Sequence, residues 1–142
     1  MDKSFETAAT AVELLQRSIS LIGTDIPAWL DLFAEDARVD FPYAASAGLP
    51  AALVGKSAIA AYFERTPAVF TGFQFTSLRL LAVTDPRWAV AEVHGSATLA
   101  RSGNAYEQDY VMVLMAEHGR VQHYREYWNP LAAPELLEGW SR

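Results

Sequence analysis

The sequence predicts an α+β fold: a curved antiparallel sheet, closed by three helices from the N-terminal half into a cone around a pocket. Apolar residues recur with helical spacing up to about residue 65, and from residue 73 onward they alternate with the period of two typical of strands. The alternating stretches are separated by TDP, RSGN and HG, which suit hairpin turns. Helices followed by a meandering sheet favour helices packed on one sheet face, and the interior of such a cone is a natural ligand pocket.

Two helices are expected at the start. Residues 4–22 carry apolar side chains at steps of three and four, and Gly23 ends this pattern. Thr24 or Asp25 can cap a second helix, and Pro27 then falls in its first turn, where proline is tolerated.

A short strand and a third helix follow. The segment ARVDFPYA, residues 37–44, is typical of a strand that Pro42 ends, and a loop rich in Ala, Gly and Pro continues to Val54. Ser57 is expected to cap a helix that runs to about Arg65 and ends before Pro67, because the residue before a proline disfavours the helical conformation.

Four strands are predicted for the rest of the chain. Each has alternating apolar residues rich in β-branched and aromatic types and is bounded by turn residues. They cover residues 73–83, 87–100, 106–117 and 120–128.

Length and composition predict one domain over residues 1–142. The 51% hydrophobic and 20% charged residues are typical of a globular chain. No apolar run reaches the roughly 20 residues needed to cross a bilayer, and the N-terminus lacks the basic-then-apolar pattern of a secretory signal. The chain has no cysteine, which is compatible with the cytoplasmic location that we expect.

Charge and motifs exclude several classes of function. The net charge is −6 and the eleven basic residues are scattered, which disfavours binding to nucleic acid. The three histidines, His94, His118 and His123, lack the spacing of a metal site. The chain has no Gly-rich phosphate loop either, so we expect neither a metal nor another cofactor.

Strand alternation separates two faces. One face of residues 87–100 carries small side chains that suit packing against another layer: Ala89, Ala91, Val93, Gly95 and Ala97. The other face carries Trp88, Val90, Glu92 and His94. In the last strand, Glu126 shares its face with Tyr124 and Trp128.

We expect the faces of both tryptophans to line the pocket. Four titratable side chains then converge among aromatic residues: Glu92, His94, Asp109 and Glu126. Desolvation raises the pKa of a carboxyl, and a neighbouring imidazole can share its proton, as general acid–base chemistry requires. Glu126 is the predicted acid/base, His94 its partner and Asp109 a proton donor to a developing enolate.

Each of these residues also has a simpler interpretation. Asp109 and Glu126 can be strand residues that face solvent or form salt bridges. His94 can be a hydrogen-bonded histidine of the core.

Three segments, LFAEDARVDFP, GKSAIAAYF and HGRVQHYREYWNPL, occur in an order that resembles the nuclear transport factor 2-like superfamily. The resemblance covers about residues 5–131 and implies a cystatin-like α+β roll. This superfamily includes ketosteroid isomerase, SnoaL-type polyketide cyclases and phenazine-biosynthesis A/B proteins, so the fold alone does not select a reaction.

The last strand is most similar to SnoaL-like proteins of the phenazine A/B type. Their Arg-Glu-aromatic-x-Asn pattern places an acid/base glutamate at Glu126. The histidine of their third helix falls on Tyr62, so His94 is expected to supply the imidazole from the sheet. Compared with ketosteroid isomerase, the position of the general-base aspartate is occupied by Phe41, which cannot accept a proton. The proton-donating aspartate has a match at Asp109. The resemblance places these residues around the substrate: Phe41, Tyr62, Trp88, Val90, Glu92, Tyr124 and Trp128.

The sequence therefore predicts a small-molecule-binding protein. We expect a cofactor-independent isomerase, cyclase, dehydratase or ketone-condensing enzyme for a small apolar or aromatic carbonyl compound. The alternative is a non-catalytic ligand-binding or dimerisation module. We also expect a homodimer formed through the outer sheet face, on the basis of the small residues assigned to that face and of the resemblance.

Overall fold

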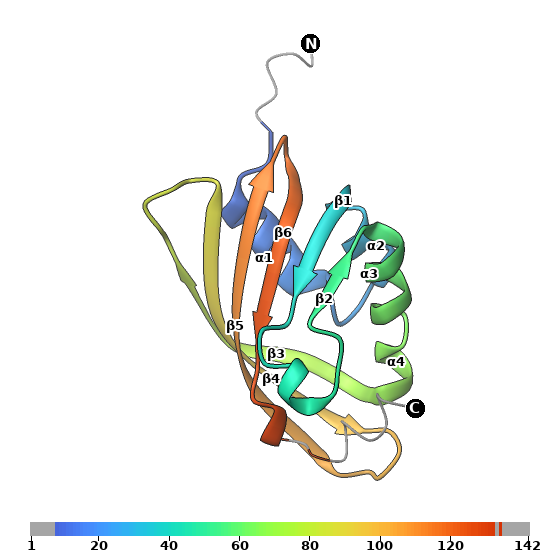
Figure 1. The fold of residues 1–142 in the computed structure, drawn as a ribbon. Helices are drawn as coiled ribbons and strands as arrows, with labels where there is room; N and C mark the ends of the chain where they lie inside the picture. Colours follow the sequence, from blue (N-terminus) through green and yellow to red (C-terminus); the bar gives the residue numbers. More distant parts are fainter. Residues whose placement is uncertain (1–7, 133, 135–142) are drawn as a thin grey trace.

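The computed structural model describes residues 8–132 and 134, which form a bent sheet with helices on one side (Figure 1). The helices are α1 (Ala11–Leu21), α2 (Ile26–Leu30), α3 (Lys56–Phe63) and α4 (Thr66–Val69). The strands are β1 (Phe33–Asp40), β2 (Ala52–Val54), β3 (Phe70–Leu81), β4 (Trp88–Leu99), β5 (Ala105–Glu117) and β6 (Arg120–Tyr127). Two short 3₁₀ turns complete the described elements, η2 (Ala45–Ala47) and η3 (Pro130–Ala132).

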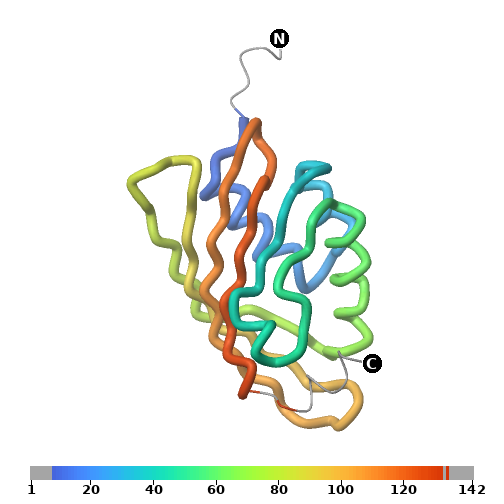
Figure 2. Tube along the Cα trace, in the orientation of Figure 1, coloured from blue at the N-terminus to red at the C-terminus, as the bar shows by residue number. Residues whose placement is uncertain are grey.

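The strands form one sheet in the order β2-β1-β6-β5-β4-β3, which confirms the predicted α+β fold. Strands β3 to β6 form the expected antiparallel meander. The pair β1–β6 is parallel, and the chain between these two strands forms β2, α3, α4 and the strands β3 to β5. The turn between β4 and β5 lies beneath α4 in Figure 2, so this end of the sheet bends toward the side of the helices.

Capping side chains determine where the first two helices begin. Thr10 and Glu13 form a capping box, so α1 begins at Ala11, later than the predicted residue 4. Residues 8–10 are not helical, and residues 4–7 lie outside the described part of the chain. Asp25 caps α2 by accepting a hydrogen bond of 3.0 Å from the Ala28 amide, in agreement with one of the two predicted caps.

The middle of the chain differs most from the prediction. The first strand begins at Phe33 rather than at residue 37 and ends before Phe41. The following loop contains β2, only three residues long, which pairs with β1 and was not predicted. The third helix is preceded by Gly55 and has no side-chain cap, so the prediction that Ser57 caps it is wrong.

The core lies between the helices and the inner sheet face. Trp29 is fully buried, with its ring centroid 4.5 Å from those of Phe33 and Phe63. Its indole N–H donates a hydrogen bond of 2.8 Å to Ser18 Oγ in α1, which satisfies the buried polar atom. Tyr124 of β6 packs edge-on against this cluster. None of the helices among the described residues is long and apolar enough to cross a membrane.

The small residues of β4 face inward, toward the helical layer. Ala89 and Ala91 are buried, and α1 packs against β4 and β5. Gly95 lies under an aromatic ring: an added Cβ would come within 2.8 Å of Tyr110 Cε2 and 3.1 Å of Phe73 Cζ. The absence of a side chain at Gly95 therefore allows these two rings to pack on the sheet.

Gly95→Ala is expected to lower the free energy of unfolding by about 1–3 kcal/mol, because the added methyl group overpacks the site beneath Tyr110. Urea denaturation measures the change. Ser96→Ala, on the opposite face of the same strand, is the matched control and is expected to change stability by less than about 0.5 kcal/mol. An unchanged or raised stability of Gly95→Ala would contradict this packing.

Candidate functional site

A cavity opens between the inner sheet face and the helices, and aromatic side chains form most of its wall. Its volume is about 90 Å³, which is enough for several waters or a small ligand. The strands β3 and β5 contribute Phe70, Phe73, Phe75, Tyr106 and Tyr110. The other aromatic lining residues are Phe41, Tyr62, Phe63 and Trp128.

Glu126 is the one carboxyl group among the described residues that line this cavity. Its residue is 8% exposed, and the hydroxyl of Tyr124 donates a hydrogen bond of 2.7 Å to Oε2. Burial raises the pKa of Glu126 to about 7, and the hydrogen bond from Tyr124 opposes part of this rise. Near neutral pH both protonation states are therefore populated, which suits a group that takes and returns a proton.

The core fixes the position of Tyr124. Its side chain is fully buried, and its ring lies edge-on to Trp29 and Phe33, with centroids 6.4 Å apart in each pair. Burial, followed by the charge of Glu126, raises the pKa of Tyr124, so its hydroxyl stays protonated. Tyr124 thus connects the packed core to one oxygen of Glu126.

A register shift in β6 turns Glu126 toward the cavity. Next to the turn, Ala116 pairs with Val121, but the following pair is Met115 with His123, so Gln122 is an extra residue in β6. Beyond this bulge Glu126 pairs with Met112, which in turn pairs with Ala91 of β4. One extra residue reverses which side chains share a face.

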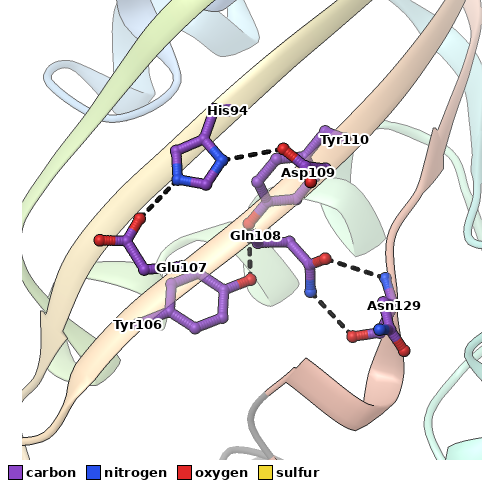
Figure 3. A network of polar contacts seen from close by, with 7 residues as sticks. All are labelled: His94, Tyr106, Glu107, Gln108, Asp109, Tyr110 and Asn129. Atoms are coloured by element: carbon purple, nitrogen blue, oxygen red, sulfur yellow. Dashed lines mark hydrogen bonds and ion pairs between the residues drawn. The ribbon is translucent and has the colours of Figure 1, made fainter.

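This shift makes the predicted convergence of four titratable residues wrong. In a regular hairpin Glu126 would pair with Val111 and share the face of Asp109; the bulge places the two on opposite faces. On the outer face His94 Nδ1 lies 2.8 Å from Asp109 Oδ1, and its Nε2 contacts Glu107 (Figure 3). The side chain of Asp109 is 94% exposed. The hydrogen bond to Asp109, which has the larger effect, and the hydrogen bond to Glu107 raise the pKa of His94.

Three further predicted pocket residues also lie outside the cavity. Glu92 is exposed and forms a 3.8 Å ion pair with Arg79. The guanidinium carbon of Arg125 lies over the Trp88 ring, 5.4 Å from the ring centroid. Val90 lies on the same outer face of the sheet as Trp88. Trp88 and Trp128 therefore belong to different faces of the sheet.

The other predicted substrate-binding positions are close to the cavity. Phe41, Tyr62 and Trp128 line it, and Tyr124 lies behind Glu126. Burial and the charge of Glu126 raise the pKa of the Tyr62 hydroxyl, so it remains protonated at neutral pH. Their roles toward a ligand stay predictions.

Sequence reasoning missed the polar residues that β5 contributes. The hydroxyls of Tyr106 and Tyr110 lie 2.7 Å apart, and both residues are buried. Burial raises the pKa of Tyr106 to about 12 and that of Tyr110 well above its usual value. Their even separation of four residues, which places both on one face of a strand, was the available signal, but the prediction assigned the other face of β5 to the pocket.

Gln108 fixes the segment that follows β6. Its amide nitrogen donates a hydrogen bond of 2.8 Å to the Asn129 carbonyl, and the Asn129 amide donates one of 3.0 Å back to Gln108 Oε1 (Figure 3). This double hydrogen bond holds Trp128 and Pro130 at the cavity wall. The described lining has a single carboxylate and neither histidine nor cysteine, a set that does not form a metal centre.

Residues 20–124 match the family model of the SnoaL-like domain. A PhzA/B-like protein of Pseudomonas aeruginosa is 35% identical over 130 residues, which are 91% of each chain. The structure of a candidate isomerase from Bacillus subtilis is similar with a TM-score of 0.81 and 31% identity, covering 91% of this chain and 93% of that one. A phenazine biosynthesis-related protein of P. aeruginosa has the same fold, with a TM-score of 0.77, 19% identity and coverage of 90% and 80%.

Glu126→Gln is expected to stabilise the protein above neutral pH. The folded-state pKa of about 7 exceeds the reference value of 4.5, so the folded state binds more protons between these values, and stability falls as the pH rises through them. At pH 8 the variant should be more stable than the wild type by up to about 3 kcal/mol, and at pH 4 the two should be similar.

Urea denaturation at the two pH values measures this difference. Glu117→Gln, at an exposed position on β5, is the control and is expected to leave both values unchanged. Equal stabilities of Glu126→Gln and wild type at pH 8 would show that burial does not disfavour the charged carboxyl.

Proposed function

The chain belongs to the SnoaL-like domain family, and from this premise we propose that it is a cofactor-independent general acid–base enzyme. Its substrate would be a small cyclic or aromatic carbonyl compound. The observation that carries the proposal is the position of Glu126, a buried carboxyl with a pKa near 7 in an otherwise apolar cavity.

The chemistry follows from the two protonation states of Glu126. As a carboxylate it takes a proton from a carbon next to a carbonyl group, and as a carboxylic acid it returns the proton to another atom. A positioned group of this kind accelerates proton transfer by about 10²–10⁴-fold. Isomerisation, cyclisation, dehydration and ketone condensation all use this step, and the similar proteins include a candidate isomerase and a candidate polyketide cyclase.

The walls of the cavity favour a small and largely apolar ligand. Phe41 packs against Tyr62 and Trp128, and these three rings line the cavity together with the aromatic residues of β3 and β5, so a flat ring in the cavity can contact aromatic side chains. Hydroxyl groups of the lining tyrosines supply polar contacts that can orient such a ligand.

Proton exchange tests the proposal without knowledge of the natural substrate. Wild-type protein is expected to catalyse exchange of the α-hydrogens of small cyclic and aromatic ketones in D₂O, followed by NMR, and the rate should rise with pH to a plateau above about 7. Glu126→Gln is expected to reduce the catalysed rate about 10²–10⁴-fold.

Glu117→Gln is the matched control and should retain the wild-type rate. Saturable ketone binding with no Glu126-dependent exchange would favour the alternative, a non-catalytic ligand-binding module.

The homodimer also remains a proposal, but its structural basis changes. The small residues of β4 are buried beneath the helices and do not form the outer face. That face instead carries Trp88, Val111, Arg125 and Tyr127, and aromatic residues and arginine are enriched at interfaces. A hollow of about 520 Å³ on this face, lined by Val111 and Tyr127 among others, offers a second copy an apolar surface.

Equilibrium sedimentation is expected to give the mass of a dimer for the wild type. Val111→Glu should shift the equilibrium toward monomer, because it places a charge in the proposed interface. Val12→Glu on α1 is the matched control, since both valines are 37% exposed. A wild type that sediments only as monomer would remove the proposal.

A further inference from the structure

We propose that the hydroxyl pair of Tyr106 and Tyr110 binds the carbonyl oxygen of the ligand and stabilises its negative charge during proton transfer. This inference rests on the acid–base function proposed for Glu126. It assigns a role to two residues of β5 that occupy the place expected for Asp109, whose side chain lies on the outer face.

The protons of the pair leave one donor for a ligand. The two hydroxyl oxygens lie 2.7 Å apart, so one hydroxyl donates its proton to the other. The second hydroxyl accepts this hydrogen bond and retains its own O–H. Accepting a hydrogen bond polarises that O–H and makes it a stronger donor.

The pair lies on the same sheet face as Glu126. Glu126 pairs with Met112 across β5 and β6, and Tyr110 is two residues from Met112 along β5. The Cα atoms of diagonal neighbours of this kind are about 7–8 Å apart, a separation that a small ring can bridge. All three side chains line the same cavity.

Packing holds both rings in place. The Tyr106 ring contacts Phe70 with centroids 4.8 Å apart, and the Tyr110 ring lies edge-on to Phe75 at 5.8 Å. Tyr106 and Tyr110 are only 3% and 6% exposed. Donors fixed before the reaction and removed from water stabilise a developing oxyanion more strongly than mobile ones.

Other lining groups are less suited to this task. No cationic side chain lines the cavity among the described residues. The amide of Gln108 is engaged with the backbone of Asn129, and Glu126 itself is the acid/base. The carbonyl oxygen is therefore expected at the tyrosine pair, and the carbon that loses its proton at Glu126.

The resulting step is balanced and redox-neutral. Glu126 takes the proton as the C–H bond breaks, and the electron pair forms a carbon–carbon double bond while the carbonyl oxygen becomes an enolate oxygen. The free O–H of the tyrosine pair donates to that oxygen. Glu126 then returns to the ligand either this proton or, in D₂O, a deuteron for which the carboxyl has exchanged it with solvent, and the carbonyl group forms again.

A ketone and an isostere without oxygen separate this role from a purely structural one. The probes are 4-fluoroacetophenone and 4-fluoro-isopropylbenzene, titrated by fluorine NMR. The carbonyl oxygen only accepts hydrogen bonds, so the ketone should bind wild type about 3–10-fold more tightly than the isostere. The variants Tyr106→Phe and Tyr110→Phe each remove one hydroxyl of the pair. The variant without the hydroxyl that donates to the ligand should have a ketone-to-isostere affinity ratio near one, and the other variant should have a ratio between one and the wild-type value. Neither substitution should change the affinity for the isostere. Tyr43→Phe, on the exposed outer side, is the control.

Deuterium exchange of the ketone's methyl group supplies the second readout. Loss of the ligand's donor should reduce catalysed exchange about 10²–10³-fold, more than it reduces ketone binding, because the hydrogen bond strengthens as charge develops. Circular dichroism verifies that each variant is folded. The wild-type protein itself must bind the ketone more tightly than the isostere, and this test does not depend on whether the variants fold.

Several results would overturn the inference. They are a wild-type ratio near one, absence of ketone binding, a ratio unchanged in both tyrosine variants, or equal losses for ketone and isostere. Failure of the proposed function gives a different pattern: Glu126→Gln leaves exchange unchanged, while the binding ratio still depends on the tyrosines.

Discussion

The bulge at Gln122 is the constraint on which the candidate site depends. It inserts one residue into β6 between the pairs that Ala116 and Met115 make, and every side chain beyond it changes face. Without it, Glu126 would lie on the outer face with Asp109. The Gln122 side chain donates a hydrogen bond of 3.0 Å to Asp36 of β1, so the extra residue is also tied to the neighbouring strand.

Once Glu126 faces inward, burial and the hydrogen bond from Tyr124 determine its chemistry. Desolvation disfavours the charged carboxyl, and the hydroxyl stabilises it, which leaves the pKa close to neutrality. The core tolerates this carboxyl because Tyr124 is held by Trp29 and Phe33. The same aromatic cluster therefore contributes to folding and orients one carboxyl oxygen of Glu126.

The fold was predictable because its signals are local, whereas half of the site depends on register. Periodicity located the four long strands, and the aromatic neighbours of Glu126 indicated its pocket. Alternation shows that a strand has two faces but not which one meets the core. The tyrosines of β5 were missed for this reason, since a regular hairpin would have turned them away from Glu126. The three-residue strand β2 has too few residues to show a period.

The two clusters of titratable residues differ in the physical origin of their pKa shifts. His94 is shifted by hydrogen bonds to exposed carboxylates, and solvent and salt screen interactions at such positions. Glu126 is shifted mainly by loss of solvent, in a cavity whose walls are mostly apolar. A ligand that displaces water from this cavity strengthens each interaction with its oxygen atom. The inner face of the sheet, with one carboxyl and the hydroxyls of β5, is therefore the face on which proton transfer to carbon has physical support.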